Sequence, residues 1–138
     1  MKSLLLKLLG TQFARFCMVG TSGLLVDMAV LALLLNTTPL GAVLSRIVSI
    51  AIAMTNNWFW NRQFTFQRSE TPQTWSQVGQ EYLRFVAVNS TGALINYASY
   101  VYMVKSTLAL SPYIALAIAT FVSLAFNFLG SKFLAFRR

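Results

Sequence analysis

The chain contains two copies of one segment, and this repeat constrains the fold more than any other feature. Residues 57–68 read NWFWNRQFTFQR, and residues 127–138 read NFLGSKFLAFRR. This alignment pairs Asn57 with Asn127 and Arg62 with Lys132. Apolar segments often look alike by chance, but polar residues that recur in register indicate a duplication. The chain is therefore predicted to consist of two copies of one structural unit.

A second pair of segments supports the duplication. Residues 15–27 read RFCMVGTSGLLVD, and residues 84–96 read RFVAVNSTGALIN. The Arg-Phe pair, a valine, two adjacent hydroxyl residues, a glycine and a leucine recur in the same order. We predict a first repeat over 13–68, a polar linker over 69–81 and a second repeat over 82–138.

Composition places the chain in a membrane. It is 57% hydrophobic and only 10% charged, whereas a soluble domain carries about 25% charged residues. Such a chain has too little polar surface to cover itself in water, so an integral membrane protein is predicted. The net charge of +8 does not indicate nucleic-acid binding, because the cations lie at the ends of apolar runs and not on a polar domain.

The predicted fold is an all-α membrane protein with four transmembrane helices. A bilayer core of about 30 Å needs about 20 helical residues. Four apolar segments reach this length: 13–35, 42–60, 82–105 and 113–131. Residues 36–41 and 106–112 are predicted as short outer loops. Because each repeat crosses twice, both repeats have the same orientation, and a pseudo-two-fold axis along the membrane normal is expected.

Cations determine the predicted orientation. Most of them fall at the two termini and in the central linker, and only Arg46 and Lys105 fall near the other side. The positive-inside rule therefore places both termini in the cytoplasm. Binding to anionic phospholipid headgroups is sufficient to explain such basic ends, so they do not by themselves indicate a substrate.

Small residues recur every fourth position on the second and fourth spans. Residues four apart share one helix face, and small side chains there allow close helix contact in lipid. We predict that the second and fourth spans cross through these faces, although small residues are also simply frequent in membrane helices. The residues are Ser45, Ser49, Ala53 and Asn57 in the first repeat, and Ala115, Ala119, Ser123 and Asn127 in the second.

The first and third spans carry polar faces that are unsuited to lipid tails. These faces must meet another helix or a polar cavity. They are formed by Gly20, Gly23 and Asp27 in the first span, and by Asn89, Gly92 and Asn96 in the third.

Asp27 and Arg46 are the most informative pair. A charge deep in a helix costs about 2.5–3.5 kcal/mol on insertion scales, so it needs a partner or a hydrated cavity. Their positions in the two spans give them matching depths. They form either an ion pair, or a site in which Arg46 holds a phosphate and Asp27 a sugar hydroxyl. A purely structural pair, or Arg46 reaching the outer headgroups, is the alternative. The second repeat has Asn96 and Leu116 at these places, so the halves are not expected to be equivalent.

No catalytic pattern is present in the sequence. The chain has no histidine, one cysteine and three acidic residues. A general base, a paired-carboxylate site and a Cys/His metal site therefore cannot be assembled. We expect a protein that is not an enzyme and that uses no cofactor or metal.

The ordered set of motifs resembles the GtrA-like family of small membrane proteins. The matching motifs are Arg15-Phe16-x-x-Val19-Gly20, Asn57-Trp58-x-x-Asn61-Arg62-x-Phe64-Thr65-Phe66, Arg84-Phe85, and Asn127-Phe128-x-x-Ser131-Lys132 with Phe136. The resemblance covers nearly the whole chain.

This resemblance implies a role in the synthesis of cell-surface polysaccharide in the bacterial inner membrane. The implied activity is translocation of a polyprenyl-phosphate-linked monosaccharide, typically undecaprenyl-phosphate glucose, which a membrane glycosyltransferase then uses. The polar faces of the first and third spans are expected to line a groove for the head. Cations at the inner rim, Arg15, Arg62, Arg84 and Lys132, are expected to receive the phosphate. Four helices enclose little volume, so a homodimer is also expected.

Two other functions are open. The chain could be a non-transporting scaffold for a glycosyltransferase, held through its small-residue faces. A small cation transporter would use an acidic residue in the first span, as Asp27 offers, but Arg46 at a matching depth argues against a free cationic substrate.

Overall fold

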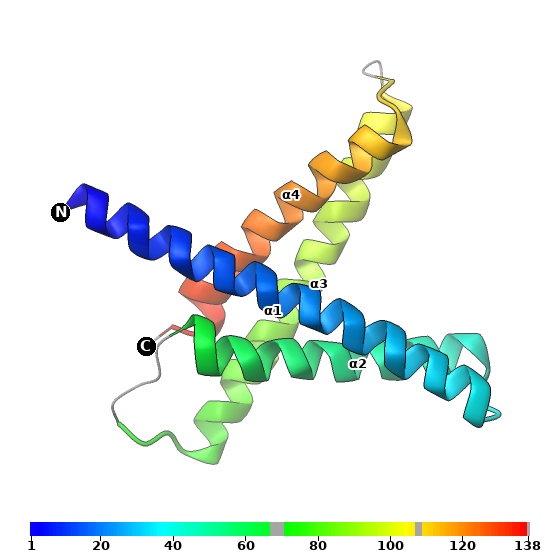
Figure 1. The fold of residues 1–138 in the computed structure, drawn as a ribbon, viewed down its shortest axis with the longest axis horizontal. Helices are drawn as coiled ribbons and strands as arrows, with labels where there is room; N and C mark the ends of the chain where they lie inside the picture. The colour runs from blue at the N-terminus through cyan, green and yellow to red at the C-terminus, as the bar shows by residue number, and fades with distance from the viewer. Residues whose placement is uncertain (67–70, 107–108, 138) are drawn as a thin grey trace. The chain divides into compact units, whose positions relative to one another are not determined.

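A computed structural model describes residues 1–66, 71–106 and 109–137 (Figure 1). Over these residues the chain is helical and contains no strand. The elements are α1 (Lys2–Thr37), α2 (Gly41–Trp60), α3 (Trp75–Lys105) and α4 (Pro112–Gly130), with five-residue π-helical segments η1 (Asn61–Thr65) and η2 (Ser131–Ala135). Some of the predictions fall on positions outside the described residues. These positions are Arg68 and Arg138 of the repeat, the start of the linker and part of the second outer loop.

The contacts divide the chain into two compact units, Met1–Glu70 and Thr71–Arg138. Each is a helical hairpin. In the first, α1 packs on α2 and η1; in the second, α3 packs on α4 and η2. The boundary between the units falls at the start of the predicted linker.

Two helices extend beyond the predicted spans. α1 begins at Lys2 instead of residue 13, because no proline or turn motif separates the basic leader from the first span. α3 begins at Trp75, so the last part of the predicted linker is helical. A capping box explains this start: Gln77 N donates to Thr74 Oγ1 at 3.3 Å, and Thr74 N donates to Gln77 Oε1 at 2.8 Å.

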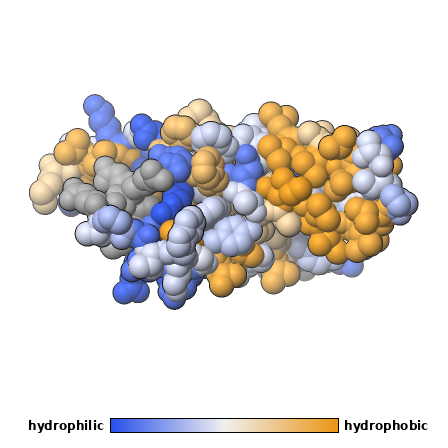
Figure 2. Space-filling model, turned by 90° about the horizontal axis from the view of Figure 1, so that it is seen from below, coloured by the Kyte–Doolittle hydropathy of each residue, from blue (hydrophilic) through white to orange (hydrophobic). Residues whose placement is uncertain are grey.

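Two segments, Lys2–Thr37 and Pro112–Ala135, are long and apolar enough to cross a membrane. α2 and α3 carry interior polar residues such as Arg46 and Asn89, so the four crossings stay a prediction. Many large apolar side chains lie on the surface (Figure 2), among them Val43 and Phe121. Such surface is suited to lipid and unsuited to water.

The ends of α2 and α4 close in the same way. In each, the chain passes into a π-helical segment, and the next amide donates to the carbonyl five residues back. Phe66 N donates to Asn61 O at 2.9 Å, and Phe136 N donates to Ser131 O at 2.8 Å. Edge-to-face ring pairs then join each end to the first helix of its hairpin, Phe16–Phe66 at 6.3 Å and Phe85–Phe136 at 5.7 Å between centroids.

One glycine in each hairpin allows the two helices to approach closely. A Cβ on Gly23 would collide with the side-chain amide of Asn57, and a Cβ on Gly92 would collide with that of Asn127. Both amide Oδ1 atoms are buried and lack a conventional hydrogen-bond partner among the described residues. The amide therefore fills the space that only glycine leaves open, at equivalent places in the two hairpins.

The small-residue stripes lie on the same helix faces as these asparagines. Ser45, Ser49 and Ala53 are buried in the first hairpin, and Ala115 and Ala119 form a buried cluster with Met103 of α3 in the second. Each stripe therefore faces the other helix of its own hairpin, α1 or α3. The predicted crossing of the second and fourth spans would be a contact between the two units, and it stays a prediction. Short loops make sequential helices antiparallel neighbours, and the small residues serve that contact.

We predict that Gly23→Ala and Gly92→Ala each lower the free energy of unfolding by about 1–3 kcal/mol, the usual cost of overpacking. The cost of Gly23→Ala should shrink in an Asn57→Ala background, because the colliding amide is gone. Equilibrium unfolding in mixed detergent micelles measures both values. Gly20→Ala is the matched control, since nothing lies near a Cβ at that position. Equal effects of the Gly20 and Gly23 substitutions would contradict the close contact.

Candidate functional site

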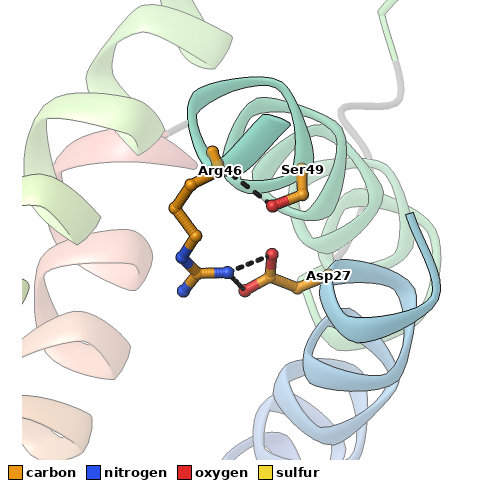
Figure 3. A network of polar contacts seen from close by, with 3 residues as sticks. All are labelled: Asp27, Arg46 and Ser49. Atoms are coloured by element: carbon orange, nitrogen blue, oxygen red, sulfur yellow. Dashed lines mark hydrogen bonds and ion pairs between the residues drawn. The ribbon is translucent and has the colours of Figure 1, made fainter. Parts of the chain in front are cut away.

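Asp27 of α1 and Arg46 of α2 form an ion pair in the first hairpin (Figure 3). Arg46 Nη1 lies 2.6 Å from both Asp27 Oδ1 and Asp27 Oδ2. The Asp27 side chain is 14% exposed, and that of Arg46 is 50% exposed. The ion pair predicted from the matching depths is therefore present, and its acidic member is the more buried.

The geometry leaves one edge of the Arg46 guanidinium open. Both oxygens of Asp27 accept from the same nitrogen, Nη1, and the other two nitrogens point away from the carboxylate in Figure 3. The Arg46 guanidinium makes no other hydrogen bond to the described residues. Nε and Nη2 together present a planar fork of donors, the arrangement that binds carboxylate or phosphate oxygens in pairs.

Ser49 lies next to the pair, about one turn further along α2. Its hydroxyl donates to Arg46 O at 3.0 Å and lies beside the Asp27 carboxylate. The small-residue stripe thus supplies the polar group that accompanies Asp27 between the two helices. A carboxylate in this position has an ionic partner and a hydroxyl, as a charge away from water requires.

The second hairpin has a neutral contact at the equivalent depth. Asn96 Nδ2 lies 3.2 Å from Ser123 Oγ and links α3 to α4. Leu116 takes the position that Arg46 has in the first hairpin. The two hairpins therefore share a backbone design but differ in the chemistry of this region, as the sequence predicted.

Several residues of the predicted polar faces make contacts within their own hairpin. Gly23 and Gly92 are covered by the amides of Asn57 and Asn127, and Asn89 donates to Phe85 O of its own helix at 2.9 Å. Of the three glycines on these faces, Gly20 is the one whose added Cβ would meet no other atom. Gly23 and Gly92 therefore lie at helix contacts within their hairpins, and the groove expected from the faces of the first and third spans stays a prediction.

The inner-rim cations have local partners. Arg15 Nη1 donates to Phe64 O at 3.0 Å, and Arg84 Nη2 donates to Ala135 O at 3.4 Å. These bonds satisfy carbonyls of the π-helical segments, which lack partners further along the helix. Arg15 and Arg84 thus hold the ends of the hairpins closed, a role that the sequence pattern did not reveal.

The other two predicted inner-rim cations lie over aromatic rings. Arg62 is 5.8 Å from the ring centroid of Trp58, and Lys132 is 5.9 Å from that of Phe133. Both distances fall within cation–π range.

An apolar cavity that was not predicted from the sequence lies beside Arg15 in the first hairpin. It has a volume of about 340 Å³, and its aromatic wall is Trp60 stacked on Phe64, with ring centroids 5.1 Å apart. In the second hairpin Gly130 occupies the place of Trp60, and it packs tightly against Val88. The Trp60–Gly130 difference in the repeat alignment was the available signal for this cavity.

The family model of the GtrA/DPMS transmembrane domain matches residues 15–136. The chain belongs to this family. The match begins at Arg15 and ends at Phe136, two of the residues that close the hairpins. No curated protein matches the chain. Family membership and the apolar helices establish a GtrA/DPMS membrane protein.

We predict unequal costs for breaking the ion pair of this GtrA/DPMS protein. Arg46→Gln leaves the more buried Asp27 carboxylate unpaired and should cost on the order of 1–3 kcal/mol of stability or more. Asp27→Asn should cost less, because Arg46 is half exposed. The double variant Asp27→Asn/Arg46→Leu reproduces the residues of the second hairpin and should regain most of the loss.

Unfolding in micelles measures this double-mutant cycle. Ser111→Ala, which removes the N-cap of α4 in the other hairpin, serves as a control with no expected coupling to either substitution. Additive losses in the double variant would show that the two charges do not stabilise each other.

Proposed function

We propose that the protein translocates a polyprenyl-phosphate-linked monosaccharide across the bacterial inner membrane, for the synthesis or modification of cell-surface polysaccharide. Membership in the GtrA/DPMS family supports the handling of lipid-linked sugars. The proposed topology has four crossings and both termini in the cytoplasm, in keeping with the distribution of cations. The proposed role involves no covalent chemistry by this chain.

The observation that carries the proposal is the open edge of Arg46. Asp27 compensates the charge of the guanidinium, so the pair can remain among apolar helices at a tolerable cost. This contact with Asp27 uses only Nη1 of the three guanidinium nitrogens. A phosphodiester can bind the other two without displacing Asp27, and it can leave without stranding a buried charge. A transporter needs this combination, because a site must bind its substrate and also release it.

An apolar groove along α2 suits a prenyl tail. It has a volume of about 620 Å³ and follows one face of α2 from Ile47 and Val48 towards Trp58 and Phe59. Ile47 directly follows Arg46 in the chain. A lipid with its phosphate on the guanidinium would therefore have an apolar path for its chain along the same helix.

Binding to a lipid panel tests the proposal. The purified protein in detergent is exposed to a polyprenyl-phosphate monosaccharide, free polyprenyl phosphate and an anionic phospholipid, with native mass spectrometry as the readout. We expect preference for both prenyl lipids over the phospholipid. This preference should fall roughly tenfold or more in Asp27→Asn/Arg46→Leu, because the charge-assisted phosphate contact is lost while the fold is retained.

Lys105→Gln is the matched control, since Lys105 is the other cation assigned to the outer side and is exposed. Its loss should leave the preference unchanged. Equal retention of all three lipids by the wild-type protein would overturn the proposal. That result would favour the scaffold function, and co-purification with a membrane glycosyltransferase would then be the expected behaviour.

A further inference from the structure

The second hairpin contains a tyrosine-lined pocket that the proposed phosphate contact does not use. Its volume is about 450 Å³, and it lies at the position where the first hairpin has its ion pair. Its lining residues are Asn96, Tyr97, Tyr100, Pro112, Tyr113 and Leu116. Asn96 and Leu116 are the counterparts of Asp27 and Arg46 in the repeat.

The base of the pocket is held rigidly. Tyr100 packs against the buried cluster of Met103, Ala115 and Ala119. Asn96 Nδ2 is held by Ser123 Oγ at 3.2 Å, which leaves its carbonyl oxygen as an acceptor. Both groups are therefore positioned before any ligand arrives, which lowers the entropic cost of binding.

The rim of the pocket is open. Tyr97 is 70% exposed and Tyr113 is 86% exposed. Tyr113 is placed by the start of α4, where Ile114 N donates to Ser111 Oγ at 3.3 Å and Pro112 fixes the first turn. Aromatic faces around a small number of fixed polar groups are typical of pockets that orient a small ligand.

A general band of interfacial aromatic residues does not account for this set. Tyr and Trp gather at membrane interfaces on all sides of a protein. In the first hairpin the aligned residues are Met28, Leu31 and Val43. The tyrosines are thus confined to one hairpin and converge on one pocket.

We propose that this pocket binds the pyranose ring of the lipid-linked sugar, and this inference rests on the proposed function. A pyranose has a C–H face that packs on an aromatic ring and hydroxyl groups that need polar partners. The tyrosine rings can pack against the C–H face, and the tyrosine hydroxyls and the Asn96 carbonyl can bind the sugar hydroxyls. All six lining residues belong to the second hairpin, so the proposal assigns recognition of the sugar to that hairpin.

The test is the sugar increment, the affinity for polyprenyl-phosphate glucose divided by that for bare polyprenyl phosphate. It is measured with the full chain in lipid nanodiscs. We expect an increment of roughly tenfold in the wild-type protein. Tyr97→Ala and Tyr113→Ala should reduce it to near one while the affinity for the bare lipid stays within about twofold. Tyr113→Phe should keep most of it, because the ring remains.

Two controls separate this inference from the proposed function. Tyr102→Ala removes an exposed tyrosine of α3 that does not line the pocket, and it should leave the increment unchanged. Asp27→Asn/Arg46→Leu should weaken both lipids alike and also leave the increment unchanged. An increment that is absent in the wild type, or insensitive to Tyr97 and Tyr113, would overturn the sugar pocket. Selective binding of both prenyl lipids would still support the translocase in that case.

Discussion

Each hairpin depends on one close contact between its two helices. At this contact an asparagine amide of one helix lies where a glycine of the other helix has no side chain. Helices in lipid gain no hydrophobic free energy by associating, so tight packing and polar contacts must hold them together. Gly23 with Asn57, and Gly92 with Asn127, provide that contact. It sets the helix separation that lets Arg15 reach the end of α2 on one side and Arg46 reach Asp27 on the other.

The two hairpins keep the same inner closure and differ towards the other end. Both have a π-helical segment, an arginine bonded to its carbonyls and an edge-to-face phenylalanine pair. Beyond the glycine contact, one hairpin carries a charge pair and the other a neutral amide beside three tyrosines. Hairpins that share their packing residues can differ elsewhere, and here the difference gives two kinds of polar site on similar pairs of helices.

The helical class and the Asp27–Arg46 pair were predictable from the sequence, because they follow from composition and depth alone, whereas the repeat stays a prediction. It could not show that Gly23 and Gly92 are contact positions, since a polar helix face predicts either a cavity or a neighbour. Arg15 and Arg84 were assigned to phosphate as cations at the inner rim. Their bonds to backbone carbonyls of the π-helical segments could not be foreseen, because no side-chain pattern reveals an irregular helix. The tyrosine pocket needed α3 and α4 to be brought together, although its residues stand out once the two repeats are compared.

Transport itself is the most direct measure of the central claim that this chain moves a lipid-linked sugar by binding its phosphate at Arg46. Purified protein is reconstituted in vesicles containing a polyprenyl-phosphate monosaccharide, and a membrane-impermeant oxidant of vicinal diols reports which sugars face outward. Vesicles without protein should lose only the outer-leaflet lipid. We predict that wild-type protein exposes the inner-leaflet lipid as well, and that Asp27→Asn/Arg46→Leu does not. Protection of the inner-leaflet lipid by the wild type, or equal exposure by the double variant, would contradict the account.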